Sequence, residues 1–140
     1  MTGGEVRWAC DTSVAVAALD PNHEAHSACR TAVLTHRPAL AGHAAFETYS
    51  VLTRLPVPLR LSAVAASEVL DAAFPEVCWL SGPDSARLRS SLGAMGIVGG
   101  SVYDALVGRA ASADDRVLLT ADRRAERTYL ALEVPYEVVG

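Results

Sequence analysis

A short apolar segment leads straight into an acid in the stretch Trp8-Ala9-Cys10-Asp11-Thr12-Ser13. The apolar residues predict a buried strand over Val6 to Cys10. The acid and the two hydroxyls after it are residue types that commonly begin helices, so the next helix is expected over Ser13 to Leu19. Asp11 therefore stands where a strand ends and a helix begins.

Three more acids lie at the edge of an apolar segment. Glu47 follows Ala45-Phe46, Asp104 follows Val102-Tyr103, and Asp122 follows Leu118-Leu119-Thr120-Ala121. Acids usually occupy solvated surface positions, so a repeated placement beside buried segments calls for another explanation.

The chain has the length and composition of one compact domain over residues 1–140. A chain of this length buries about two-thirds of its unfolded surface when it folds. With 51% hydrophobic and 20% charged residues, it is too apolar for a disordered segment.

Charge and cysteine content indicate the cellular setting. The net charge of −4 weighs against general nucleic-acid binding, and the twelve basic residues are all arginine. Arginine suits phosphate, but an Ala-, Arg- and Gly-rich chain is more typical of a GC-rich genome. The odd set of cysteines, Cys10, Cys29 and Cys78, has no metal-binding spacing and predicts buried thiols in a reducing compartment. Residues 1–7 resemble no signal peptide or membrane span, so a cytoplasmic protein is expected.

Helices and strands are expected to alternate along the chain. The other helices are predicted over His23–Leu34, Ala44–Leu55, Ser62–Phe74, Ser85–Met95, Ser101–Ala113 and Asp122–Leu130, and the other strands over Ala39–Ala41, Val77–Leu80, Arg116–Thr120 and Tyr136–Val139. Such alternation with unbroken apolar strands predicts an α/β sandwich around a central, mostly parallel sheet of about five short strands.

In such sheets ligands bind beyond the carboxyl ends of the strands. Asp11 follows the first strand and Asp122 follows the strand predicted over 116–120, so both acids belong on the same rim. Glu47 shares a helix face with Ala44 and Val51, which places it on an apolar stripe.

Asp104 belongs to the first turn of its predicted helix. Gly108 and Ala111, on the same face, are small enough for backbone to approach closely.

Converging carboxylates need a proton or a cation between them. Two unit charges about 4 Å apart repel by roughly 4 kcal/mol at an effective dielectric of about 20. Oxygen ligands without suitable Cys or His partners favour Mg²⁺ or Mn²⁺ over zinc, and such an ion suits phosphodiester hydrolysis.

Each acid alone also fits a structural role. Asp11 and Asp122 could cap helices, Asp104 could interact with a helix dipole, and Glu47 could pair with Arg54. Their joint placement favours the shared metal site.

Four motifs occur in order along nearly the whole chain: Asp11-Thr12-Ser13, Glu47 followed by Leu52-Thr53-Arg54-Leu55-Pro56, Tyr103-Asp104-Ala105 followed by Ala110-Ala111, and Leu118-Leu119-Thr120-Ala121-Asp122-Arg123-Arg124. In this combination the sequence resembles the PIN domain family, and within it the VapC-type toxins of bacterial toxin–antitoxin pairs. The resemblance implies a single three-layer PIN-like domain that acts as a Mg²⁺- or Mn²⁺-dependent endoribonuclease.

The resemblance also implies roles for individual residues. Asp11, Glu47, Asp104 and Asp122 would form an acidic quartet. Asp11 and Asp104 would contact the metal most directly, and the other two would ligate through water or orient the attacking water. The hydroxyls of Thr12, Ser13 and Thr120 would support the carboxylates or touch the phosphate.

The partners implied are an RNA substrate, a cognate antitoxin and a second copy in a homodimer, with no membrane. Candidate contacts to RNA phosphates or to the antitoxin are Arg54, Arg123, Arg124 and Arg127.

Two other functions remain open at this point. A catalytically silent PIN-like interaction module would keep the fold without the chemistry. A phosphatase using Asp11 as nucleophile is disfavoured, because Ser13 stands where such enzymes need a second Asp and the chain has no Lys.

Overall fold

A five-stranded sheet forms the centre of the structure, a computed structural model that describes residues 4–140. The first three residues of the domain expected over 1–140 lie outside this range. The strands are β1 (Arg7–Cys10), β2 (Ala39–Ala41), β3 (Val77–Cys78), β4 (Arg116–Thr120) and β5 (Tyr136–Val138). They lie in the order β3-β2-β1-β4-β5, and every neighbouring pair is parallel, so the predicted sheet is confirmed.

The sequence order of the strands reverses at the junction of β1, the central strand, and β4. Cys10 pairs with Leu119 there, and the strand order runs outward from β1 to β3 on one side and from β4 to β5 on the other. Parallel sheets bind ligands at such a reversal, at the carboxyl ends of the strands. Asp11 directly follows β1, and Asp122 follows β4 after Ala121.

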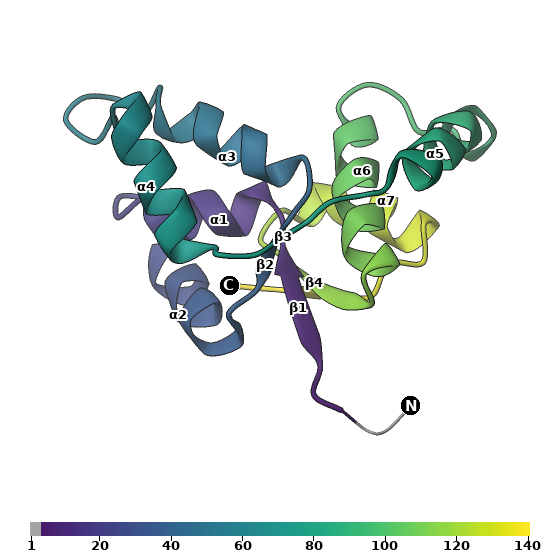
Figure 1. Cartoon of the computed structure of the whole chain (residues 1–140), viewed down its shortest axis with the longest axis horizontal. Helices are drawn as coiled ribbons and strands as arrows, with labels where there is room; N and C mark the ends of the chain where they lie inside the picture. The colour runs from purple at the N-terminus through teal and green to yellow at the C-terminus, as the bar shows by residue number, and fades with distance from the viewer. Residues whose placement is uncertain (1–3) are drawn as a thin grey trace.

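Helices cover both faces of the sheet and make three layers, as Figure 1 shows. On one side lie α1 (Thr12–Leu19), α2 (His26–His36), α3 (Ala44–Leu52) and α4 (Ala63–Ala73); on the other lie α5 (Gly82–Met95), α6 (Ser101–Ala113) and α7 (Glu126–Ala131), which a 3-10 turn over Arg123–Ala125 precedes. Contacts of α1 with β1 and β4, and of α6 with β1, β2 and β4, bury the central strands from both faces.

Capping residues fix where several helices begin. Asp11 accepts a hydrogen bond from the backbone of Val14 at the start of α1. The hydroxyls of Ser62 and Ser81 do the same for α4 and α5. Because Asp11 is both the cap of α1 and the residue after β1, its position is fixed by two elements at once.

The predicted strand over 77–80 is wrong in length. β3 ends at Cys78, which pairs with Ala41, the last residue of β2. Gly42 then turns away with a φ of 51°, so Trp79 has no strand to pair with and is 59% exposed. The chain instead enters α5 at Gly82, earlier than the predicted Ser85.

Three predicted helices also differ from the structure. α2 begins at His26 rather than His23, because the ring of His23 accepts a hydrogen bond from the backbone of Ala25 within a turn. α3 ends at Leu52, and the hydroxyl of Thr53 bonds carbonyls of its last turn. The helix predicted over 122–130 is split, because Asp122 caps the 3-10 turn and α7 begins at Glu126.

The three cysteines are free and buried, as predicted. Within residues 4–140, none of the helices has both the length and the apolar character needed to cross a membrane.

Candidate active site

All four predicted acids line one cavity of about 220 Å³ at the carboxyl end of the sheet. Asp11 comes from the end of β1, Glu47 from α3, Asp104 from the first turn of α6, and Asp122 from the residues after β4. The remaining lining residues are Thr12, Ser13, Val107 and Tyr129. Four separate segments therefore contribute one carboxylate each to the same cavity.

Asp11 is the most buried of these acids, with 5% of its surface exposed. Its Oδ1 accepts hydrogen bonds from the Ser13 hydroxyl at 2.5 Å and the Val14 amide at 3.2 Å. Its Oδ2 accepts one from the Tyr129 hydroxyl at 2.8 Å. Burial raises the pKa of Asp11, although these bonds and one from Thr120 oppose the increase.

The three predicted hydroxyls each contact an acid or its backbone. Thr12 donates to Oε1 of Glu47 at 2.9 Å. Ser13 also accepts from the amide of Ala121 at 2.8 Å, which ties the residue after β4 to the start of α1. Thr120 accepts from the amide of Asp122 at 3.1 Å. These bonds hold the acid-bearing segments in register with one another.

The pKa of Asp104 reflects the repulsion among the acids of the cavity. Its pKa is raised to about 6, first because burial removes water and then because the charges of Asp122, Asp11 and Glu47 repel its own. The guanidinium of Arg124 partly opposes this increase. The cavity is therefore a place where negative charge is unfavourable without a counter-ion.

Arg124 is the predicted arginine that contacts an acid of the cavity. Its Nε lies 3.5 Å from Oδ1 of Asp122, and 94% of its side chain is exposed. Arg123 pairs with Glu126 at 3.6 Å, and Arg54 donates to Ser50 at 3.2 Å rather than to Glu47.

Arg127, the last of the four predicted arginines, lies exposed on α7. Glu47 and Arg54 are not among the ion pairs of residues 4–140, so the alternative in which they pair finds no support.

Both structural roles considered for the strand-end acids are also present. Asp11 caps α1, and Asp122 accepts from the amide of Arg124 at the start of the 3-10 turn. Capping and cavity lining do not exclude each other, because a carboxylate has several lone pairs.

Sequence reasoning missed Tyr129 and Val107 as lining residues. Tyr129 lies inside the segment predicted as one helix, where nothing local indicates its contact with Asp11. A buried tyrosine needs a partner for its hydroxyl, but the sequence does not show which one.

The chemistry of the acids fits a hard divalent cation. The cavity is lined by carboxylate and hydroxyl oxygens and by no Cys or His, which favours Mg²⁺ or Mn²⁺ over zinc. Within residues 4–140, no three such acids, histidines or cysteines lie close enough together to surround an ion by themselves. Mg²⁺ commonly binds through one or two carboxylates and keeps several waters, so a looser set of acids is compatible with it.

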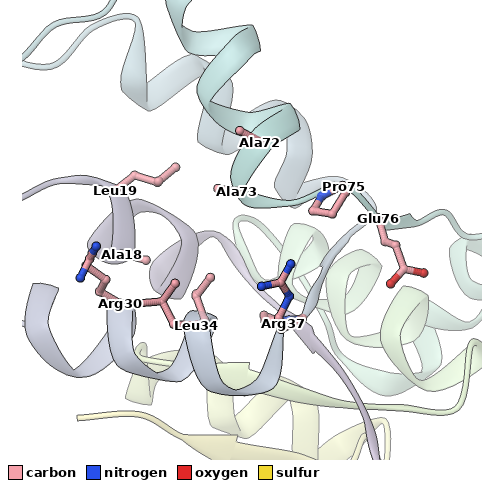
Figure 2. Close-up of a pocket in the computed structure, with 11 residues that line it drawn as sticks. Ala18, Leu19, Arg30, Leu34, Arg37, Ala72, Ala73, Pro75 and Glu76 are labelled. Carbon is pink, nitrogen blue, oxygen red and sulfur yellow. The ribbon is translucent and has the colours of Figure 1, made fainter.

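A second cavity, of about 400 Å³, lies among α1, α2 and α4. Figure 2 shows Leu19 and Leu34 near Ala72 and Ala73, with Arg37 and Glu76 at one end. Because Glu76 is the one carboxylate in its lining, this apolar groove is unsuited to the metal chemistry of the first cavity.

Comparison with known proteins agrees with this geometry. The PIN domain family matches residues 9–130, a range that contains all four acids. "Ribonuclease VapC27" of Mycobacterium tuberculosis is 47% identical over 122 residues, covering 86% of this chain and 88% of the relative. "Ribonuclease VapC40" from the same species is 44% identical over 130 residues, covering 92% and 96%. The chain therefore belongs to the PIN domain family, in its VapC group.

Proposed function

We propose that this protein is the toxin of a toxin–antitoxin pair and cleaves RNA internally, using Mg²⁺ or Mn²⁺ held by the four acids. The observation that carries the proposal is the meeting of four carboxylates from four segments in one cavity. The family match also supports the proposal, because the similar family members VapC27 and VapC40 are named ribonucleases.

An ion held there would supply charge neutralisation at the phosphate and a water of lowered pKa. Attack of that water on the phosphorus would break the bond to the 3′ oxygen, leaving a 5′-phosphate on one product and a 3′-hydroxyl on the other. Asp11 and Asp104 would hold the ion, since one is fixed by hydrogen bonds and the other carries charge that needs compensation. Thr12 bonds one oxygen of Glu47, which leaves the other to accept a hydrogen bond from the attacking water. Asp122 would contact the ion through water.

The test of this function is incubation of the purified protein with total cellular RNA and either ion. We expect a limited set of internal cuts with 5′-phosphate ends, which sequencing of the new ends would locate. Intact RNA with both ions, from protein that is folded by circular dichroism, would instead favour a silent interaction module.

The charge of the cavity leads to a prediction about stability. The folded pKa of Asp104, about 6, exceeds the reference value of 3.8, so ionisation destabilises the fold increasingly as pH rises through this range. We expect Asp104→Asn to raise the melting temperature of metal-free protein by about 2–4 °C at neutral pH. The gain should fade as pH falls from about 6 to below 3.8, where the wild-type acid is protonated in both states.

Added ions should act in the opposite direction and favour the wild type over Asp104→Asn in melting temperature. Millimolar Mn²⁺ or Mg²⁺ should raise the melting temperature of the wild type, and should raise that of Asp104→Asn less. Thermal melts with and without ion measure both effects. Equal gains in the two proteins would mean that Asp104 does not take part in ion binding.

We propose that Arg124 is the main arginine contact to RNA phosphate, because it is exposed beside Asp122 at the rim of the cavity. Arg54, Arg123 and Arg127 are secondary candidates. The salt dependence of RNA binding by Arg124→Ala, compared with Arg89→Ala on α5, tests this contact.

We also propose that a cognate antitoxin binds this protein in the cytoplasm and that its apolar side chains enter the groove of Figure 2. Arg30 and Arg37 in the lining of this groove would pair with acids of that partner. Hydrogen exchange with and without the antitoxin tests the proposal, which requires slower exchange in α1, α2 and α4.

A homodimer is the third proposal on partners. The rings of Phe46 and Trp79 lie 5.7 Å apart and are 65% and 59% exposed, an apolar surface that a second copy would bury. Light scattering of the purified protein measures the mass. If Phe46→Ser has the same mass in solution as the wild type but binds RNA more weakly, the aromatic pair of Phe46 and Trp79 contacts RNA instead of a second copy.

A further inference from the structure

Tyr129 is a fully buried residue of α7 whose hydroxyl reaches the carboxylate of Asp11. Its exposed fraction is 0%, and its Oη donates to Oδ2 of Asp11 at 2.8 Å. The two residues are 118 positions apart in sequence, so the bond joins α7 to the junction of β1 and α1. It is thus a tertiary contact of the cavity and no part of local helix capping.

The ring of Tyr129 is held on two sides. Gly108 of α6 lies so close that a Cβ there would come within 3.0 Å of the ring. The ring of Tyr136 packs against it with centroids 5.8 Å apart. With little room for the ring to tilt, the position of the hydroxyl is fixed by packing.

The hydrogen bonds of Asp11 exceed what its capping role requires. A helix cap needs one oxygen to accept from the backbone, and Oδ1 already does so while also accepting from Ser13. The bond from Tyr129 restrains Oδ2 separately. With both oxygens restrained, the carboxylate cannot rotate freely, and its remaining lone pairs keep a set direction in the cavity.

We propose that Tyr129 is a positioning residue that orients Asp11 for ion binding and thereby sets both the affinity for the divalent ion and the rate of cleavage. The inference rests on the proposed function. Partners that orient a ligating carboxylate typically change metal affinity or activity by about 10–100-fold when they are removed. The competing explanation is that Asp11 merely satisfies a buried phenol.

The test is Tyr129→Phe, which keeps the ring and removes only the hydroxyl. The matched control is Tyr136→Phe, because Tyr136 packs on the same ring but donates its hydroxyl to Glu126 at 2.8 Å. Titration calorimetry with Mn²⁺ alone, at a temperature where every variant is folded, measures ion affinity without RNA. Steady-state cleavage then separates kcat from KM.

We expect Tyr129→Phe to lower both Mn²⁺ affinity and kcat by about 10–100-fold with little change in KM, and Tyr136→Phe to change neither. A lower melting temperature with Mn²⁺ affinity and kcat within about twofold of the wild type would overturn the positioning role, because that is what a purely structural hydrogen bond predicts. If wild-type protein neither binds Mn²⁺ nor cleaves RNA, the proposed function itself fails and this inference fails with it.

Discussion

Asp11→Asn is expected to lower kcat for RNA cleavage by about a thousandfold while leaving the fold intact. The substitution removes one negative charge that would face the ion. Two unit charges about 4 Å apart interact by roughly 4 kcal/mol at an effective dielectric of about 20, and each 1.4 kcal/mol changes a rate about tenfold. Steady-state cleavage of a defined RNA measures the loss in kcat.

The fold should survive because asparagine can replace the structural contacts of Asp11. Its amide oxygen can accept from Val14 and Ser13, and its amide nitrogen can donate to the Tyr129 oxygen. Burial already raises the pKa of Asp11, which means that its charge is costly in the folded protein. The melting temperature of metal-free Asp11→Asn should therefore equal or exceed that of the wild type.

The control for this substitution is Asp71→Asn on α4, an acid-to-amide change at an exposed position that does not line the cavity. It should cleave RNA like the wild type. Wild-type protein treated with a chelator should lose cleavage, and added Mn²⁺ should restore it. Retention of cleavage by Asp11→Asn would remove Asp11 from the proposed catalytic set, whatever the other acids do.

The positions of Asp11 and Asp122 relative to each other could be predicted from the sequence. Each follows a strand, and parallel strands end at the same edge of a sheet. The positions of Glu47 and Asp104 were harder to predict, because both lie on helices, and the rotation of a helix about its axis decides where each side chain points. Their apolar and small neighbours on the same helix face gave the correct side, and the structure places both in the cavity.

The contact between Tyr129 and Asp11 could not be predicted. The segment over 122–130 has the pattern of one helix, but a 3-10 turn occupies its first part. A 3-10 turn has fewer residues per turn than an α-helix, so it changes which residues of α7 face the core. That change depends on how Asp122 caps the turn in the folded protein, and no local pattern shows it.

The length of β3 was mispredicted for a related reason. The apolar run over 77–80 has the composition of a strand, but a strand exists only where a neighbour pairs with it. β2 ends at Ala41, so β3 ends at its partner Cys78. The exposed Trp79 that results packs against Phe46, in the aromatic pair that we propose a second copy would bury.

Gly108→Val is expected to destabilise the protein by about 2–3 kcal/mol, because overpacking a close contact costs this much. A Cβ at this position would lie 3.0 Å from the ring of Tyr129 and 3.2 Å from Val134, and the branched carbons of valine would reach further. At this chain length the loss corresponds to a fall in melting temperature of about 6–12 °C. Thermal melts of metal-free protein measure it.

Gly93→Val is the matched control, since Gly93 also lies inside a helix but a Cβ there would meet nothing within 4 Å. Valine has a slightly better helix propensity than glycine, so this variant should melt at or a little above the wild-type temperature. Equal melting temperatures for both variants would show that the ring of Tyr129 can move at little cost. The packing would then be too loose to hold its hydroxyl on Asp11. A large loss confined to Gly108→Val would instead show that α6 and α7 hold that ring rigidly in place, which is what orienting a carboxylate requires.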